Sequence, residues 1–243
     1  MNNLTLLALD TSTEACSVAL LHRGEKTYCD ELAQRTHTKR ILPMIDDLLA
    51  QSGIGLNQVD ALVFGRGPGS FTGVRVGAGI AQGLALGADL PVIPISNLSA
   101  MAQAAYEQYR AERVIAAIDA RMNEVYFAQF EAQKVRSEFG EFLHWQPLVE
   151  EQVGSPQKML EQIHGSGQGK TPKPLGVGTG WQAYTQLSEA DIAEASSIEL
   201  PSARYMLSLA LPLWYNKRMI SAVEIEPVYL RNEVTWKKLP GRE

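Results

Sequence analysis

The sequence of 243 residues predicts an α/β protein made of two similar lobes, and three observations support this fold class. Apolar runs and helical spacings alternate in the order β-β-β-α-β-α-β-α, and the second half of the chain follows the same order. A buried strand ends in Asp10 in the first half and in Asp119 in the second. A glycine-rich turn occurs at residues 65–69 and again, at one constant offset, at residues 176–180.

The elements of the first half follow from local patterns. Strands are predicted over residues 4–9, 15–21, 26–32, 61–64 and 91–95. Helices are predicted over residues 39–52 and 72–87, and from Ser96, as its N-cap, to about residue 109. The first of these helices rests on apolar residues at helical spacing, namely Ile41, Leu42, Ile45, Leu48 and Leu49. Pro43 would kink this helix if it began much before Lys39.

The second half is predicted to repeat this order with low sequence identity. Strands over residues 114–118, 124–131 and 139–149 and a short helix over 155–164 precede the second glycine turn, and a last helix runs from 202 to about 217. Residues 165–174, rich in glycine, proline and lysine, are predicted to be a flexible loop. The domain prediction is a first lobe over 1–110 joined by the helix at about 202–218, a smaller lobe over 111–201, and a surface tail over 219–243.

Residues 64–87 are the segment around which the chain is organised: a strand, a glycine-rich turn and a helix. Ser70 and Thr72 are candidate N-caps of this helix. A glycine turn at a helix N-terminus favours an anion, because free N–H groups point outward there. The glycine spacing fits neither a P-loop nor a dinucleotide-binding fingerprint. A phosphate site and a tight turn without a ligand therefore both stay open.

Three glycines inside the same helix, Gly79, Gly83 and Gly87, lie four residues apart and so close to one face. Each costs roughly 0.5–1 kcal/mol of helix stability relative to alanine, so the row needs a reason. A face without side chains lets another backbone approach closely. The row either packs on the protein's own sheet or contacts a second chain.

The composition excludes several classes of protein. A net charge of −5 argues against tight, autonomous RNA binding, which needs a basic face. No apolar run reaches the roughly 20 residues of a membrane helix, and the N-terminus has no signal-peptide pattern. Two cysteines, Cys16 and Cys29, do not make a disulfide framework. We therefore expect a protein of the reducing cytoplasm.

Catalytic and metal-binding patterns are missing from the sequence. The four histidines are scattered and no two of them are four residues apart, so they make no metal pair. Two cysteines provide no zinc spacing, and Ser70 follows Gly-Pro-Gly rather than the Gly-x-Ser-x-Gly turn of a serine nucleophile. The sequence therefore predicts no catalytic residue, no metal ligand and no cofactor held by this chain.

Paired acidic and glycine turns predict a cleft between the lobes, as in the actin-like (RNase H-like), sugar-kinase and Hsp70 ATPase superfamily. Asp10 and Asp119 are expected to face each other across this cleft. Because Arg66 is the only basic residue in either glycine turn, we expect a degenerate nucleotide site. The candidate cleft residues are Asp10, Thr11, Ser12, Gly67, Gly69, Asp119, Gly178 and Gly180.

Four segments carry a resemblance to a known family. They are LALDTST with EACSVALL, GRGPGSFTGVRVGAGIAQGLA, IDARMNEVYFA and EPVYLRNEVTWKKLP. Together they resemble the bacterial TsaB (YeaZ) family, from Leu4 through the C-terminal tail and most weakly over 131–165. The resemblance implies a duplicated actin-like fold and a non-catalytic subunit that activates TsaD, together with TsaE, in making N6-threonylcarbamoyladenosine at position 37 of tRNAs that read codons starting with A.

The same resemblance implies that ATP, Mg²⁺ and metal belong to the partner subunits, that TsaC supplies threonylcarbamoyl-adenylate, and that tRNA is contacted through the complex. Residues 94–101 correspond to the TsaD stretch that carries a metal-binding histidine pair, and they contain no histidine. The chain alone is expected to form a homodimer through its first two helices. The candidate interface for homodimer and TsaD is Ile41, Leu42, Ile45, Leu49, Arg75, Gly79 and Gly83.

One departure from the family concerns residues 36–39, Thr-His-Thr-Lys, where members often have His-Ser-Glu. It places a positive charge at the expected partner-facing edge. Two other interpretations stay open: an enzyme in its own right, either an actin-like kinase or ATPase or a glycoprotease-like metallopeptidase, and a homodimeric scaffold that binds no nucleotide.

Overall fold

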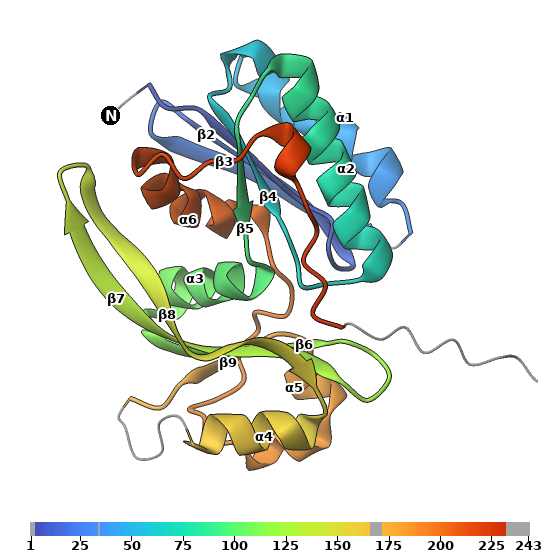
Figure 1. Cartoon of the computed structure of the whole chain (residues 1–243), viewed down its shortest axis with the longest axis vertical. Coiled ribbons are helices and arrows are strands. Elements are labelled where there is room, and N and C mark those ends of the chain that lie inside the picture. Colours follow the sequence, from blue (N-terminus) through green and yellow to red (C-terminus); the bar gives the residue numbers. More distant parts are fainter. Residues whose placement is uncertain (1–2, 34, 166–171, 232–243) are drawn as a thin grey trace, which may run out of the picture.

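A computed structural model of the chain describes residues 3–33, 35–165 and 172–231, and two sheets form its two lobes (Figure 1). The first sheet has the order β3-β2-β1-β4-β5. Its strands are β1 (Leu6–Asp10), β2 (Ala15–His22), β3 (Glu25–Leu32), β4 (Ala61–Gly65) and β5 (Val92–Ile95). β1, β4 and β5 are parallel, whereas β2 and β3 form an antiparallel hairpin. Arg23 and Gly24, both with positive φ, make its two-residue turn.

The second sheet has four strands in the order β8-β7-β6-β9. They are β6 (Arg113–Asp119), β7 (Val125–Ser137), β8 (Gly140–Gly154) and β9 (Leu175–Val177). The predicted duplication is correct, and residues 193–198 run parallel to β9 in the place that β5 takes in the first sheet. They exchange four backbone hydrogen bonds with residues 174–178, although only the pair Gly176–Ala195 forms a regular bridge. Polar residues interrupt this segment, so it lacks the continuous apolar run of a buried parallel strand.

Six α-helices of the described chain cover the two sheets: α1 (His37–Gln51), α2 (Phe71–Ala88), α3 (Asn97–Tyr109), α4 (Pro156–Gly165), α5 (Gly180–Ala183) and α6 (Ala203–Tyr215). Ser70 and Ser96 cap α2 and α3 by accepting backbone N–H bonds from Gly73 and Ser99, as predicted for both. α1 begins at His37, two residues before the predicted start, and contains Pro43. None of the described helices is long and apolar enough to cross a membrane.

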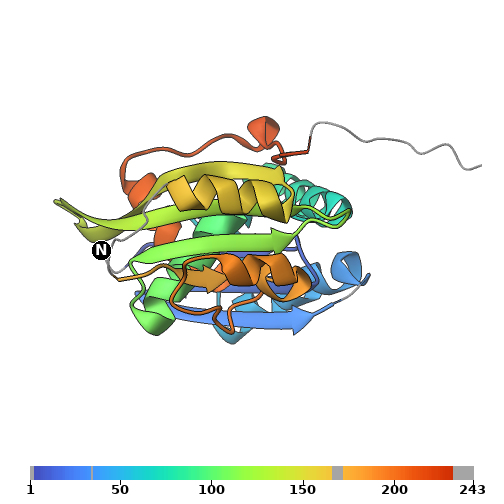
Figure 2. The same cartoon turned by 90° about the horizontal axis from the view of Figure 1, so that it is seen from below.

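Alternating side chains of the first sheet separate two cores. Leu7 and Leu9 of β1 pack with α1 and α2, whereas Leu6 and Ala8 pack with α6 on the opposite face. The second sheet likewise has α3 on one face and α4 on the other. Figure 2 shows α4 and α5 over its outer face.

Each of the two helices between the sheets packs on the sheet of the other half of the sequence. α3, which the domain prediction placed in the first lobe, buries Leu98, Met101 and Ala105 against the second sheet. α6 comes after the second lobe, and it buries Met206 and Leu207 against the first sheet. The boundary near residue 110 therefore divides the sheets but not the cores, because each sheet needs a helix from the other half of the sequence.

Two further segments connect the lobes. β7 and β8 are longer than predicted, and their hairpin reaches α6, where the Phe139 ring stacks on Tyr215 with centroids 4.5 Å apart. The start of the predicted surface tail is also packed: Ile220 pairs with Val92, and Ala222 and Ile225 are buried in the first lobe's core. The basic residues Lys237, Lys238 and Arg242 of that tail lie outside the described residues.

Candidate functional site: the inter-lobe turns and the outer face of α2

Asp10 lies at the carboxyl end of β1 and is only 1% exposed. Its Oδ1 accepts a hydrogen bond of 2.9 Å from Asn97 Nδ2, and its Oδ2 accepts one of 3.0 Å from Ser12 Oγ. An ideal Cβ on Gly65 would lie 2.1 Å from Oδ1, so the carboxyl group fills the space left by that glycine. Burial raises the pKa of Asp10 to about 6, against the lowering effect of the Asn97 and Ser12 hydrogen bonds.

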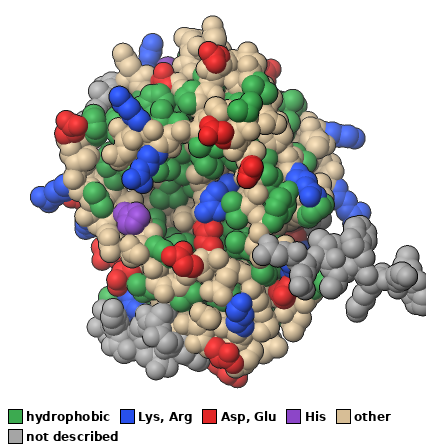
Figure 3. Space-filling view, viewed as in Figure 1, with side chains coloured by type: hydrophobic (Ala, Val, Ile, Leu, Met, Phe, Trp, Pro, Cys, Tyr) green, Lys and Arg blue, Asp and Glu red, His purple; other side chains and the backbone are tan. Residues whose placement is uncertain are grey.

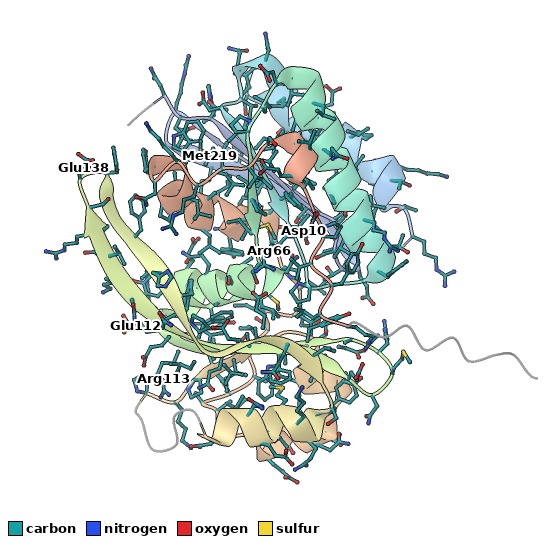
Figure 4. All side chains as sticks on the ribbon, viewed as in Figure 1. Asp10, Arg66, Glu112, Arg113, Glu138 and Met219 are labelled. Carbon is teal, nitrogen blue, oxygen red and sulfur yellow. The ribbon has the colours of Figure 1, made fainter. Side chains whose placement is uncertain are left out.

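The sequence predicts that Asp10 faces Asp119 across a groove; in the structure the Asp10 side chain is buried, and its two oxygens accept hydrogen bonds from Asn97 and Ser12. Figure 4 shows Asp10 and Arg66 at the side of the first sheet that faces the second lobe. A carboxyl group held this way is poorly placed to reach a metal ion or a nucleotide, because either would need an accessible carboxylate.

The first glycine turn packs directly on the acidic turn of the same lobe. An ideal Cβ on Gly69 would lie 2.4 Å from the Ser12 carbonyl oxygen, and one on Gly73 would lie 2.2 Å from that of Thr11. The N–H of Ser70 donates to the Ser12 carbonyl at 2.7 Å. The close backbone approach explains why both positions are glycine. The hydrogen bond to Ser12 also occupies the N–H of Ser70, which an anion bound at this turn would otherwise use.

Asn97 connects the first glycine turn to the acidic turn, because its Oδ1 accepts a hydrogen bond from the N–H of Gly67 at 2.8 Å while its Nδ2 donates to Asp10. Sequence analysis missed Asn97. A signal was present, since Asp10 ends one strand of a parallel set and Gly67 and Asn97 each come two residues after another, and the carboxyl ends of parallel strands meet at one edge.

Asp119 is likewise held by its own lobe. Tyr184 donates its hydroxyl to Asp119 Oδ1 at 2.8 Å, and the N–H of Arg121 donates to the same oxygen at 2.9 Å. Gly178, with φ of 107°, packs so closely on β6 that an ideal Cβ would lie 2.0 Å from the Ala117 carbonyl oxygen, and the equivalent position on Gly180 would lie 3.0 Å from it. Both predicted pairs of acidic and glycine turns exist, and each is closed by internal contacts.

The lobes meet through ion pairs beside these turns. Arg121 of the second lobe lies 3.3 Å from Glu14 of the first, and Arg66 lies 3.1 Å from Glu151 of β8. Next to the latter pair is a cavity of 460 Å³ with hydrophobic side chains in its wall, and Figure 3 shows hydrophobic side chains gathered in the hollowed middle of this face. None of the predicted cleft residues lines the cavity. Its lining residues are Arg66, Ser99, Phe130, Trp145, Pro147, Glu150, Glu151, Val228 and Leu230.

The predicted partner surface is corrected at residue level. Ile41, Ile45, Leu48 and Leu49 are buried in the first lobe's own core, because that face of α1 lies on the sheet. Leu42, on the other side of the helix, is 44% exposed. On α2, Gly79 and Gly83 are exposed, and ideal Cβ atoms there would meet nothing within 4 Å. The glycine row therefore points away from the protein's own sheet.

The outer face of α2 is flanked by large apolar groups. Phe71 is 58% exposed and Leu86 is 59% exposed at its two ends. Arg75 lies with its guanidinium carbon 3.2 Å from the centroid of the Phe71 ring. We call Phe71, Arg75, Gly79, Gly83 and Leu86 the α2 face. Among the described residues no group of three or more His, Cys, Asp or Glu could hold a metal ion.

Two α/β lobes that each set an acidic turn against a glycine turn, with exchanged helices between them, define a protein of the actin-like class. Comparisons agree. A family model described as "TsaD: tRNA N6-adenosine threonylcarbamoyltransferase" matches residues 29–222. A Haemophilus influenzae protein named tRNA threonylcarbamoyladenosine biosynthesis protein TsaB is 69% identical over 243 residues, all of both chains. An Escherichia coli protein of the same name is 48% identical over 240 residues, 98% of this chain and 99% of that one.

A solved structure, YeaZ from Pseudomonas aeruginosa, has 42% sequence identity and a TM-score of 0.79, covering 93% of this chain and 100% of that one. The chain belongs to the TsaB (YeaZ) family.

Proposed function

We propose that this chain is the non-catalytic subunit that binds and activates TsaD, together with TsaE, in N6-threonylcarbamoylation of adenosine 37 in tRNAs that read codons starting with A. Relatives that match the whole chain carry a name in threonylcarbamoyladenosine biosynthesis. One observation supports the subunit role above the others: the α2 face offers a backbone without side chains at Gly79 and Gly83. The burial of the Asp10 carboxyl group agrees with it.

The α2 face suits another helix. Helices normally pack with axes 8–10 Å apart, and glycines at the crossing permit a closer approach. Phe71 and Leu86 lie one at each end of the row and add exposed apolar area. A two-fold contact between two copies would be self-complementary, so the same face serves a homodimer when TsaD is absent and TsaD when it is present.

The direct test is reconstitution of tRNA modification with purified TsaC, TsaD, TsaE, L-threonine, bicarbonate, ATP·Mg²⁺ and tRNA. We expect threonylcarbamoyladenosine to form only when this chain is added, because TsaD needs its partner to be active. Mass spectrometry of digested tRNA measures the product. Equal product without the chain would refute the proposal, and product formed by the chain without TsaD would favour the enzyme alternative.

The isolated chain is expected to bind ATP·Mg²⁺ no more tightly than about 1 mM, which corresponds to roughly −4 kcal/mol. The N–H groups of Gly67 and Ser70 already donate to Asn97 and Ser12, so a phosphate would have to displace internal hydrogen bonds. Isothermal titration calorimetry measures the affinity. Micromolar binding that is lost in Asp10→Ala would contradict a degenerate cleft.

A further inference from the structure

We propose that residues 225–231, here called the strap, couple occupation of the α2 face by a second copy of this chain to the turn at residues 120–124 of the second lobe. The inference rests on the proposed partner surface and adds a regulatory connection to it. The strap is anchored at three points, on α2, on the first glycine turn and on the second lobe (Figure 1).

The first anchor belongs to the α2 face itself. The Tyr229 ring lies 6.2 Å from the Phe71 ring, and the Arg75 guanidinium lies 5.3 Å from Tyr229 and 3.2 Å from Phe71. Tyr229 is 44% exposed, so it extends the apolar surface that a docking helix would meet. A partner on the α2 face therefore touches the strap as well as the helix.

The middle of the strap lies on the first glycine turn. Val228 donates its N–H to the Arg66 carbonyl at 2.9 Å, and its own carbonyl oxygen lies 3.1 Å from the position of a Cβ on Gly67. Val228 and Leu230 line the inter-lobe cavity, while Tyr229 between them lies against α2. This alternation is that of an extended chain, in which successive side chains point to opposite sides. A shift of Tyr229 therefore pulls on two neighbours that line the cavity, one of which is hydrogen-bonded to the first glycine turn.

The far anchor is Arg231, which holds a strained turn. Arg121, Met122 and Asn123 have φ of 62°, 55° and 58°, three consecutive residues in the left-handed region that only glycine adopts freely. Arg231 donates to the Ala120 carbonyl at 3.0 Å and pairs with the carboxylate of Glu124. A strained backbone persists only when its surroundings hold it, and Arg231 supplies contacts at both ends of this one.

These contacts predict a positive coupling between binding at the α2 face and order in the turn at residues 120–124. A second copy that packs on Tyr229 fixes the strap, and a fixed strap keeps Arg231 on the turn. Coupling between two sites is reciprocal, so an intact Arg231 anchor must also strengthen binding at the α2 face by the same factor. Conversely, loss of the Tyr229 anchor on α2 weakens the Arg231 anchor on the turn, and loss of the Arg231 anchor weakens that of Tyr229.

The first measurement is amide hydrogen exchange at Ala120 and Glu124, whose N–H groups are both hydrogen-bonded within the turn. It uses the full chain, diluted until light scattering shows monomers. We expect Tyr229→Ala to raise exchange at both amides about tenfold, although Tyr229 does not touch the turn. Tyr28→Ala is the matched control, because Tyr28 is also an exposed tyrosine stacked on an arginine, Arg204. Unchanged exchange in Tyr229→Ala would overturn the strap.

The second measurement is the homodimer dissociation constant. We expect Arg231→Ala to weaken dimerisation about fivefold. The double variant of Tyr229→Ala and Arg231→Ala should lose less binding free energy than the two single variants together, because both residues act through one segment. Arg136→Ala, which removes an exposed ion pair with Glu141, is the control. An unchanged or tighter dimer in Arg231→Ala, or additive losses, would contradict the coupling. A dimer that survives Gly83→Leu would instead refute the partner surface, and the exchange result on monomers would still decide on the strap.

Discussion

Replacing Gly83 by leucine is expected to leave the chain folded and to abolish its pairing with a second copy and with TsaD. A leucine side chain at Gly83 would enter open space, since an ideal Cβ there meets nothing within 4 Å. Removing a glycine from an exposed helix position also gains up to about 1 kcal/mol of helix stability. The same side chain would stand between two closely packed helices, so we expect association to weaken at least about 100-fold, roughly 2.7 kcal/mol.

Light scattering and co-elution with TsaD measure assembly, and circular dichroism with urea unfolding measures the fold. Gly73→Ala is the matched control within the same helix, because its Cβ would lie 2.2 Å from the Thr11 carbonyl oxygen. That variant should lose stability by 1–3 kcal/mol or more through overpacking. A folded Gly83→Leu protein that still dimerises and still binds TsaD would show that the α2 face is not the contact.

The second large effect concerns Asp10, whose pKa is raised to about 6 from an ordinary 3.8. Between these values the folded protein binds a proton that the unfolded chain has released. The free energy of unfolding therefore falls as pH rises from about 4 to about 6, by roughly 3 kcal/mol from this group. Asp10→Asn removes the charge and keeps the shape, so we expect it to lack this fall and to exceed the wild type in stability at pH 7.

Urea unfolding at several pH values between 4 and 7 measures the free energy of unfolding of the wild type and of Asp10→Asn. The titration of other carboxyl groups cancels in the difference between these two free energies. Asp10→Ala should instead be destabilised at every pH, because Asn97 Nδ2 and Ser12 Oγ lose a buried partner at about 1–3 kcal/mol each. Parallel pH curves for wild type and Asp10→Asn would contradict a raised pKa at this buried carboxyl group.

Local patterns were enough to predict most elements from the sequence. Apolar periodicity located the strands of the first sheet, and Ser70 and Ser96 identified two helix starts, because capping depends on neighbours in the chain. The constant offset between the glycine turns revealed the duplication. The start of α1 was placed two residues late because Pro43 was expected near the beginning of the helix, whereas α1 begins at His37 and carries Pro43 as its seventh residue.

Properties that depend on distant residues were not predicted. Spacing placed Gly79 and Gly83 on one side of α2, but it could not say which side faces the sheet. Ile41 and Ile45 were assigned to a partner surface because the sequence does not show how much of α1 its own sheet covers. The burial of Asp10 was not predicted, because its hydrogen-bond partner Asn97 is far along the chain.

The exchange of α3 and α6 has a consequence for synthesis on the ribosome. The face of the first sheet that carries Leu6 and Ala8 stays uncovered until α6, which follows both sheets in the chain, has left the exit tunnel. α3 emerges early, but the sheet it covers follows it in the chain. Neither half is a folding unit that can finish before the other, unlike the domains of proteins that fold one after another from the N-terminus. Nascent chains of this protein should therefore depend on protection of an exposed apolar sheet until α6 has emerged.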